Sequence, residues 1–173
     1  QMLYTASEII ASGYPSGAHI GKIGFHLNAV PADAITAISV SLKNYAGISL
    51  VGFQTGMTPV FTGDFDTPAP GWQDITLQTP FLWDGSSSLL VEICFDHASG
   101  TTNAMVMAQF AINRIKVATQ NYGNGCSLSN ASSYSYRPNI RLAIAPPLPA
   151  LNPFPAIGAT TQHTSLAWSP GSG

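Results

Sequence analysis

The side chains that could act as acids, bases or nucleophiles are few in this sequence and form no recognisable constellation. The 173 residues include two glutamates, Glu8 and Glu92, and four histidines scattered at positions 19, 26, 97 and 163. The chain contains no Gly-x-Ser-x-Gly nucleophile elbow, no His-Glu-x-x-His motif and no phosphate-binding glycine loop. We therefore expect no catalytic residues and no cofactor, and we predict that the protein is not an enzyme.

Oxygen ligands for a metal ion are also sparse. Asp64, Asp66 and Asp96 are the candidates for calcium, which prefers carboxylate and carbonyl oxygens. The Asp64–Asp66 loop has no third carboxylate close by and no EF-hand spacing. The sequence predicts no metal site.

Aromatic side chains offer a different chemistry, because an exposed ring can stack on the face of a sugar. Trp83 precedes a predicted Asp-Gly turn, and Tyr122 lies in a glycine-rich segment. Tyr134 and Tyr136 alternate with serines in a polar stretch. These four residues are the candidate glycan platform, and the alternative that they pack beneath loops stays open. Trp72 begins a predicted strand and is interpreted as a lid over the core.

The two cysteines, Cys94 and Cys126, permit one intramolecular disulfide bond. Closing a loop of this length would stabilise the fold by about 3.7 kcal/mol in the chain-entropy description. Low charge, paired cysteines and no metal-ligand spacing indicate an oxidising compartment, so we expect a secreted protein, extracellular or at the cell surface. The alternative is two reduced, buried thiols. Asn130 begins an Asn-Ala-Ser glycosylation sequon.

The composition excludes several classes of protein. Charged residues make only 8% of the chain and hydrophobic residues 45%, so the chain can fill a core and is not disordered. A net charge of −2 lacks the basic footprint of a nucleic-acid-binding protein or of a protein on an anionic membrane. The sequence has no run of 18 apolar residues, so we expect no membrane insertion.

Short alternating segments between glycines and prolines must position these side chains. Apolar and polar residues alternate over 23–27 and 38–42, which is typical of strands with one buried face. We predict further strands over 48–54, 59–62, 72–79, 88–95, 104–110, 112–117 and 136–144. The sequence thus predicts an all-β fold, an antiparallel β-sandwich of jelly-roll-like type, over residues 1–145. Glu92 falls inside an apolar strand, where we expect it to pair with Arg114 or Arg141.

The composition changes after Ala145. Residues 146–163 form a Pro-rich linker, and 164–173 hold one strand-like piece without a partner strand of its own. An ordered tail has to bury its apolar groups. We expect the tail to dock on a neighbouring subunit by strand addition. The residues expected to mediate this self-association are Leu148, Leu151, Phe154, Ile157, Leu166 and Trp168.

Several stretches resemble a secreted module of multidomain proteins from Bacteroidota and related bacteria. The most recognisable part is Gly71-Trp72-Gln73-Asp74-Ile75-Thr76-Leu77 with the following Pro80 to Gly85 and Leu89 to Phe95. Residues 4–13 and 19–25 are similar to its first two strands, and 137–142 to its last. The module commonly precedes fibronectin type III repeats, and residues 164–173 are similar to the start of such a repeat. The resemblance implies a secreted β-sandwich with adhesive, scaffolding or glycan-contacting duties.

Two functions follow as hypotheses. The first is a non-catalytic structural or adhesive subunit that forms a homo-oligomer or homopolymer, a filament or surface layer, through its C-terminal tail. The second is a carbohydrate-binding module of a larger secreted protein.

Overall fold

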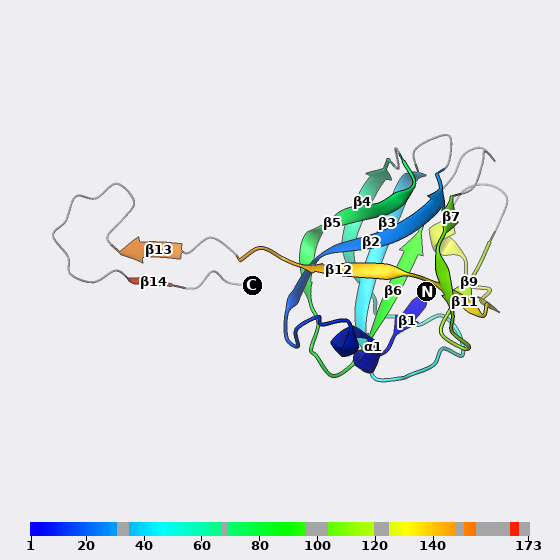
Figure 1. The fold of residues 1–173 in the computed structure, drawn as a ribbon, viewed down its shortest axis with the longest axis horizontal. Coiled ribbons are helices and arrows are strands. Elements are labelled where there is room, and N and C mark those ends of the chain that lie inside the picture. The colour runs from blue at the N-terminus through cyan, green and yellow to red at the C-terminus, as the bar shows by residue number, and fades with distance from the viewer. Residues whose placement is uncertain are drawn as a thin grey trace.

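The computed structural model describes residues 1–30, 35–66, 69–95, 104–119 and 125–147, together with the backbone of two further strands at 151–154 and 167–169. Two antiparallel sheets pack face to face, as Figure 1 shows. The first sheet has the strand order β1-β6-β3-β4. Its strands are β1 (Met2–Tyr4), β6 (Ser88–Cys94), β3 (Ile35–Tyr45) and β4 (Thr58–Phe65).

The second sheet has the order β12-β2-β5, and a short strand β7 continues the β12 edge of β2. Its strands are β12 (Ile140–Ile144), β2 (His19–Ala29), β5 (Gly71–Leu82) and β7 (Met105–Val106). The chain changes sheets between β2 and β3, between β4 and β5 and between β5 and β6. The predicted jelly-roll-like β-sandwich is therefore confirmed.

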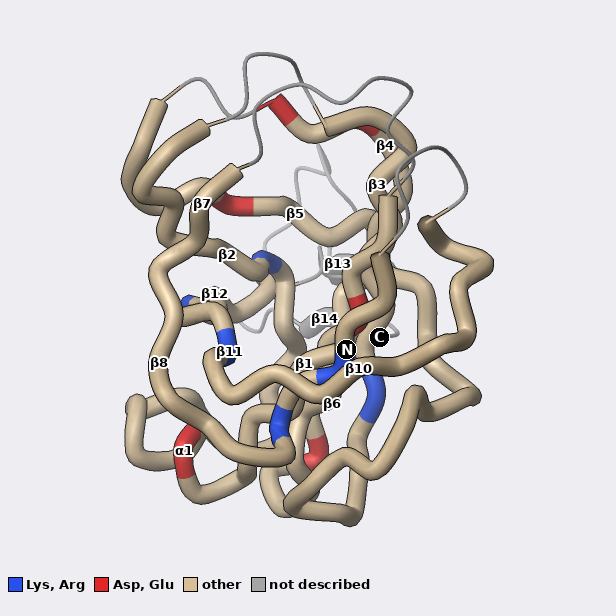
Figure 2. The backbone as a smooth tube through the Cα atoms, turned by 90° about the vertical axis from the view of Figure 1, so that its right-hand side faces the viewer, with Lys and Arg blue, Asp and Glu red and all other residues tan. Residues whose placement is uncertain are grey.

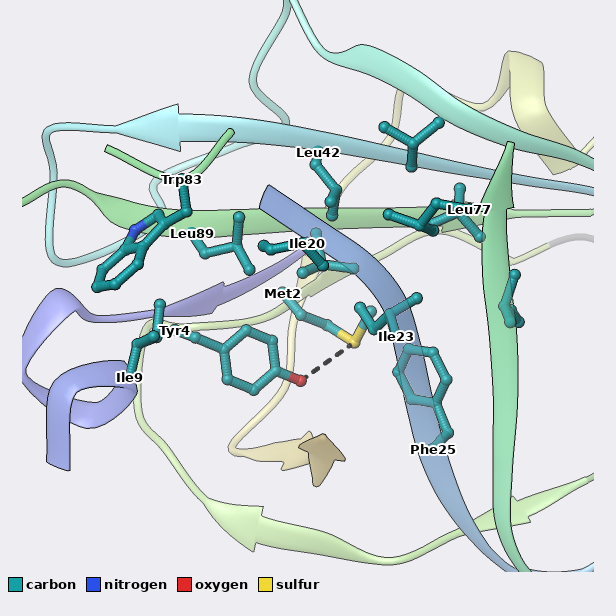
Figure 3. Packing of buried hydrophobic residues seen from close by; sticks show 14 of the residues in the cluster. Met2, Tyr4, Ile9, Ile20, Ile23, Phe25, Leu42, Leu77, Trp83 and Leu89 are labelled. Carbon is teal, nitrogen blue, oxygen red and sulfur yellow. Dashed lines mark hydrogen bonds between the residues drawn. The ribbon is translucent and has the colours of Figure 1, made fainter. Parts of the chain in front are cut away.

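The core lies between the two sheets and follows the alternation in the sequence. Ile23, Phe25 and Leu27 of β2 are buried, and Val40 and Leu42 of β3 are fully buried opposite them. Figure 3 shows Ile23, Phe25 and Leu42 among residues of β1, β5 and the first helix. Burying each such aliphatic side chain contributes about 2 kcal/mol, so the strand pattern itself drives the two sheets together.

A helix replaces part of the strand that the resemblance implied over residues 4–13. After β1 the chain forms α1 (Ala6–Ala11), which ends at Ser12. The Glu8 carboxylate accepts hydrogen bonds from the backbone N–H and the hydroxyl of Thr5, both at 2.8 Å. This Thr-x-x-Glu arrangement is a helix-start signal, which explains why the strand ends at Tyr4.

The predicted strand over 48–54 is wrong, because the chain between β3 and β4 forms an irregular loop. Leu50 of this loop is buried against Leu3 and Leu90 on the outer face of the first sheet. The side chain of Gln1 holds the loop, since its Oε1 accepts from Gln54 N–H at 2.7 Å and its Nε2 donates to Gln54 O at 2.8 Å. The apolar residues that suggested a strand here cover the outer face of the first sheet and do not add a strand to it.

Three other predicted strands are shorter than expected. The segment 104–110 divides into β7 and β8 (Ala108–Phe110), and 136–144 divides at Asn139 into β11 (Tyr136–Pro138) and β12. Only β9 (Lys116–Val117) remains of the strand predicted over 112–117, and it pairs with β10 (Ser132–Ser133). The pair β8–β11 forms a two-stranded ribbon beside the second sheet. A short 3-10 helix, η1, spans Gly125–Ser127.

The C-terminal tail supplies a partner strand from within itself. β14 (Ala167–Ser169) pairs antiparallel with β13 (Leu151–Phe154) in a separate two-stranded sheet (Figure 1). The expectation that the last strand lacks a partner in its own segment is therefore wrong. Leu148, Ile157 and Leu166 lie outside the described residues, and docking of the tail on a second subunit stays a prediction.

The edge of the first sheet is partly closed to an added strand. The side-chain amide of Gln78 donates to Thr62 O at 2.7 Å and accepts from Thr62 N–H at 3.2 Å. These two bonds occupy the backbone groups that an incoming strand would use at this point of β4. Within the described residues, no helix has the length and apolar character needed to cross a membrane.

The predicted disulfide is present. Cys94 at the end of β6 is bonded to Cys126 in η1, with an S–S distance of 2.07 Å and a sequence separation of 32 residues. The bond ties the connection that follows β6 back to the end of that strand. It therefore limits the conformations of the unfolded chain, and this stabilises the folded state.

We predict that replacing both cysteines by serine lowers the free energy of unfolding by about 3.7 kcal/mol, the loop-closure value for this chain length. Denaturant titration of the oxidised protein and of the double variant measures the difference. Adding reductant should destabilise the parent and leave the variant unchanged. Equal unfolding midpoints for the two proteins would contradict a structural role for the bond.

Candidate functional site

The candidate glycan platform predicted from the sequence is not assembled as expected. Trp83 is fully buried, its indole N–H donates to Ser87 O at 2.8 Å, and its ring meets Tyr14 edge-on at 6.1 Å between centroids. Figure 3 shows it at the end of the core. Trp83 is therefore wrong as a platform residue, because the turn that carries it closes over the core. Tyr122 lies outside the described residues.

Two predicted tyrosines are exposed on the β8–β11 ribbon and its approach. Tyr134 is 55% and Tyr136 63% exposed. Tyr136 lies opposite Phe110 in the register, and their rings meet edge-on at 5.8 Å. Asn130 of the sequon is exposed too, a few residues before this ribbon.

The opposite face of the same ribbon lines a groove. Because side chains alternate along a strand, Gln109 and Arg137, which pair in the register, point away from the face of Phe110 and Tyr136. The groove has a volume of about 370 Å³. Its polar lining consists of Glu8, Gln109, Arg137 and Asn139.

The remaining lining is mostly apolar and comes from four segments of the chain. Tyr4 of β1, Ile9 and Ser12 at α1, Ile140 and Leu142 of β12, and Trp72 of β5 line the groove. A second hollow of about 330 Å³ shares Ser12 and Leu142 with it and continues toward Ile144. The two hollows are therefore neighbours along β12 and α1. Aromatic and aliphatic walls with a few convergent polar groups are typical of small-ligand sites.

An ion pair between a buried arginine and a partly exposed glutamate lines the groove. Arg137 is 1% exposed, and its Nη2 donates to Glu8 Oε1 at 2.9 Å. Its Nη1 donates to Leu3 O, and the guanidinium lies 4.1 Å from the centre of the Tyr4 ring. Arg114 Nη1 donates to Glu8 Oε2 at 2.8 Å. Arg137 Nε is buried and has no hydrogen-bond partner among the residues that the structure describes.

These contacts fix the ionisation of Glu8. Partial burial would raise the pKa of this carboxyl, but hydrogen bonds from Arg137 and from Thr5 outweigh burial and lower the pKa from 4.5 to about 2. Glu8 is therefore ionised at every pH at which most proteins work. It can accept hydrogen bonds but has no proton to donate.

Trp72 stands at the mouth of the groove, on the outer face of the second sheet. Its side chain is 38% exposed, so the interpretation of Trp72 as a lid over the core is wrong. His26, opposite it in the register, meets the indole edge-on at 5.3 Å. The guanidinium of Arg141 lies 5.0 Å from the indole centre. These contacts hold the ring in one orientation although it faces solvent.

Arg141 is in turn fixed by Asp74. Its Nε and Nη2 donate to the two carboxylate oxygens of Asp74 at 2.7 and 2.8 Å. The hydrogen bond from Arg141 lowers the pKa of Asp74. The pair passes directly over Gly24 of β2, where an added Cβ would lie 2.1 Å from Asp74 Oδ1. The absence of a side chain at Gly24 thus makes room for the ion pair.

The expected ion pair of Glu92 is not formed. Glu92 accepts a hydrogen bond from Gln1 Nε2 at 2.5 Å, whereas Arg114 pairs with Glu8 and Arg141 with Asp74. Arg114 and Arg141 instead contact two residues that line the groove, Arg114 through Glu8 and Arg141 through Trp72. Sequence reasoning missed this because the partners are far apart along the chain.

Within the part of the chain that the structure describes, no three His, Cys, Asp or Glu side chains gather as metal ligands would. Comparison with known proteins gives no further assignment, since no family model, no curated protein and no solved structure matches this chain.

We predict that the Glu8 ion pairs make the free energy of unfolding fall as the pH is lowered into the acid range. A carboxyl whose pKa is lowered on folding contributes stability above its unfolded pKa, here about 4.5, which is lost as the pH falls toward 2. Glu8→Gln should be less stable than the parent at pH 7, and the gap should narrow between pH 4.5 and 2. Thermal unfolding of both proteins across this range measures it. A gap that stays constant with pH would contradict the role given to Glu8.

We predict that Gly24→Ala displaces the Asp74–Arg141 pair while the sandwich stays folded. The pKa of Asp74 should rise toward its ordinary value, because the hydrogen bonds from Arg141 weaken. Carboxyl-carbon NMR titration follows this residue directly. Gly52→Ala is the matched control, since an added Cβ there meets nothing within 4 Å. An unchanged Asp74 titration in Gly24→Ala would show that the pair does not depend on the space over this glycine.

Proposed function

We propose that this chain is a non-catalytic carbohydrate-binding module of a secreted or cell-surface protein, which holds a sugar ring against Trp72 at the mouth of the groove. The single observation that carries the proposal is the half-exposed indole, kept in one orientation by His26 and Arg141. A ring that is already immobilised loses little conformational entropy when a ligand stacks on it.

The groove beside Trp72 supplies the polar partners that a sugar needs. Gln109 and Asn139 carry amides that both donate and accept hydrogen bonds, and the Glu8 carboxylate accepts them. Hydroxyl groups of a sugar match this mixture, whereas a purely apolar ligand would leave the polar groups without partners.

The lowered pKa of Glu8 in the groove and of Asp74 near Trp72 favours binding over acid–base catalysis. Glu8 and Asp74 are both held ionised by guanidinium groups, so neither is suited to protonate a leaving group near neutral pH. The Cys94–Cys126 bond supports an oxidising compartment, where such modules meet extracellular glycans.

The exposed aromatic pair of Tyr136 and Phe110 is the competing platform for a sugar ring. It lies on the face of the β8–β11 ribbon that points away from the groove.

We predict that Trp72→Ala weakens binding of a glycan identified on an array by roughly 30-fold, as expected when a central aromatic contact is removed. Tyr136→Ala is the matched control and should bind as the parent does. Isothermal titration calorimetry measures both affinities.

The two outcomes separate the two faces of the ribbon. Loss of binding in Tyr136→Ala with normal binding in Trp72→Ala would place the site on the ribbon face of Tyr136 and Phe110 and contradict the proposal. Failure of the folded protein to bind any glycan on the array would contradict carbohydrate recognition itself. Circular dichroism of each variant excludes unfolding as the cause of a loss.

A further inference from the structure

The charges around the groove are unlike those of the whole chain. The chain carries a net charge of −2. In the described contacts around the groove and Trp72, however, the four cations Lys22, Arg114, Arg137 and Arg141 meet two carboxylates, Glu8 and Asp74. Figure 2 shows Lys and Arg on β11, β12 and the neighbouring strands. Two positive charges therefore stay unmatched beside the groove of an acidic protein.

Some of the guanidinium N–H groups beside the groove are not engaged. Arg137 Nε is buried and has no hydrogen-bond partner among the described residues. Arg141 binds Asp74 through Nε and Nη2, and its Nη1 has no partner among the described residues. Lys22 is exposed and its charge reaches Asp74 beside Trp72. Arg141 Nη1 and the Lys22 ammonium are placed to meet acceptor atoms of a ligand, whereas Arg137 Nε is shielded from solvent.

The placement of Arg141 matters most, since the same side chain stacks on Trp72 and borders the open surface. Its side chain is 46% exposed. A sugar ring lying on the indole would have its substituents within reach of this guanidinium. Guanidinium groups bind carboxylate and sulfate oxygens better than neutral hydroxyls, because the hydrogen bonds are charge-assisted.

We infer that the groove recognises an acidic polysaccharide, whose sugar ring stacks on Trp72 while its carboxylate or sulfate group binds at Arg141 and Lys22. This inference rests on the proposed function and specifies its ligand class. The neighbouring hollow, which lies along β12 toward Ile144, offers a place for further sugars of a chain. Electrostatic complementarity of this kind distinguishes ligands by charge more than it adds affinity.

The test compares ligands that differ only in charge. Oligogalacturonate and its methyl ester have the same rings, and dextran sulfate and dextran form a second pair in which sulfate replaces carboxylate. We expect the parent protein to bind at least one acidic member about tenfold more tightly than its neutral counterpart. The preference should shrink as salt rises from 50 to 500 mM, because exposed charges are screened.

Two variants locate the charge recognition, and one serves as their control. Lys22→Gln removes a cation without touching the Trp72 platform, and Arg141→Gln removes the stacked one. Both should lower the ratio of acidic to neutral affinity severalfold. Lys43→Gln is the control, because Lys43 lies on the first sheet and donates to Thr55 O at 2.6 Å. Its ratio should equal that of the parent.

Each outcome decides a different statement. Equal affinity for the charged and neutral members of both pairs, or a ratio unchanged in Lys22→Gln and Arg141→Gln, would overturn the acidic ligand class and leave carbohydrate binding intact. Failure of every glycan, charged or neutral, to bind would overturn the proposed function together with the inference. The pair that shows the preference identifies carboxylate or sulfate as the group bound.

Discussion

The buried guanidinium of Arg137 joins β1, α1 and β11, so the packing of these three elements depends on it. A cation that is 1% exposed is tolerated only if its charge and its N–H groups find partners, and Glu8 together with Leu3 O supplies most of them. Glu8 also bonds Thr5 at the start of α1, so one carboxylate joins a helix start to a strand 129 residues away. Through this contact β1, α1 and β11 are held together, and the groove lies where they meet.

The second sheet then offers two surfaces with different properties. Its inner face is a conventional aliphatic core, which any alternating sequence can form. Its outer face is organised by a glycine: because Gly24 has no side chain, Asp74 and Arg141 meet across β2 and place a cation beside Trp72. An exposed aromatic ring is usually mobile, and here the ion pair and His26 restrict it.

Although the chain has few charged residues, several of them are paired with one another. Charged residues make 8% of the sequence, and all three of its arginines, Arg114, Arg137 and Arg141, take part in ion pairs. The wider surface carries exposed apolar groups such as Phe110 and Tyr136, which the low charge leaves uncovered. The tail pairs with itself in the hairpin β13–β14, so its strand does not require an edge of the sandwich for hydrogen bonding.

The sequence by itself determined the alternating strands, the sandwich and the pairing of its only two cysteines, because each follows from local periodicity or from counting. Only the tertiary structure decided which aromatic ring reaches solvent. Trp83 and Trp72 both stand near the ends of the same strand, yet one is closed in by a turn and the other lies on the outer face. Their burial, like the pairing of Asp74 with Arg141 67 residues later, depends on what distant segments place across from them, and local sequence holds no record of that.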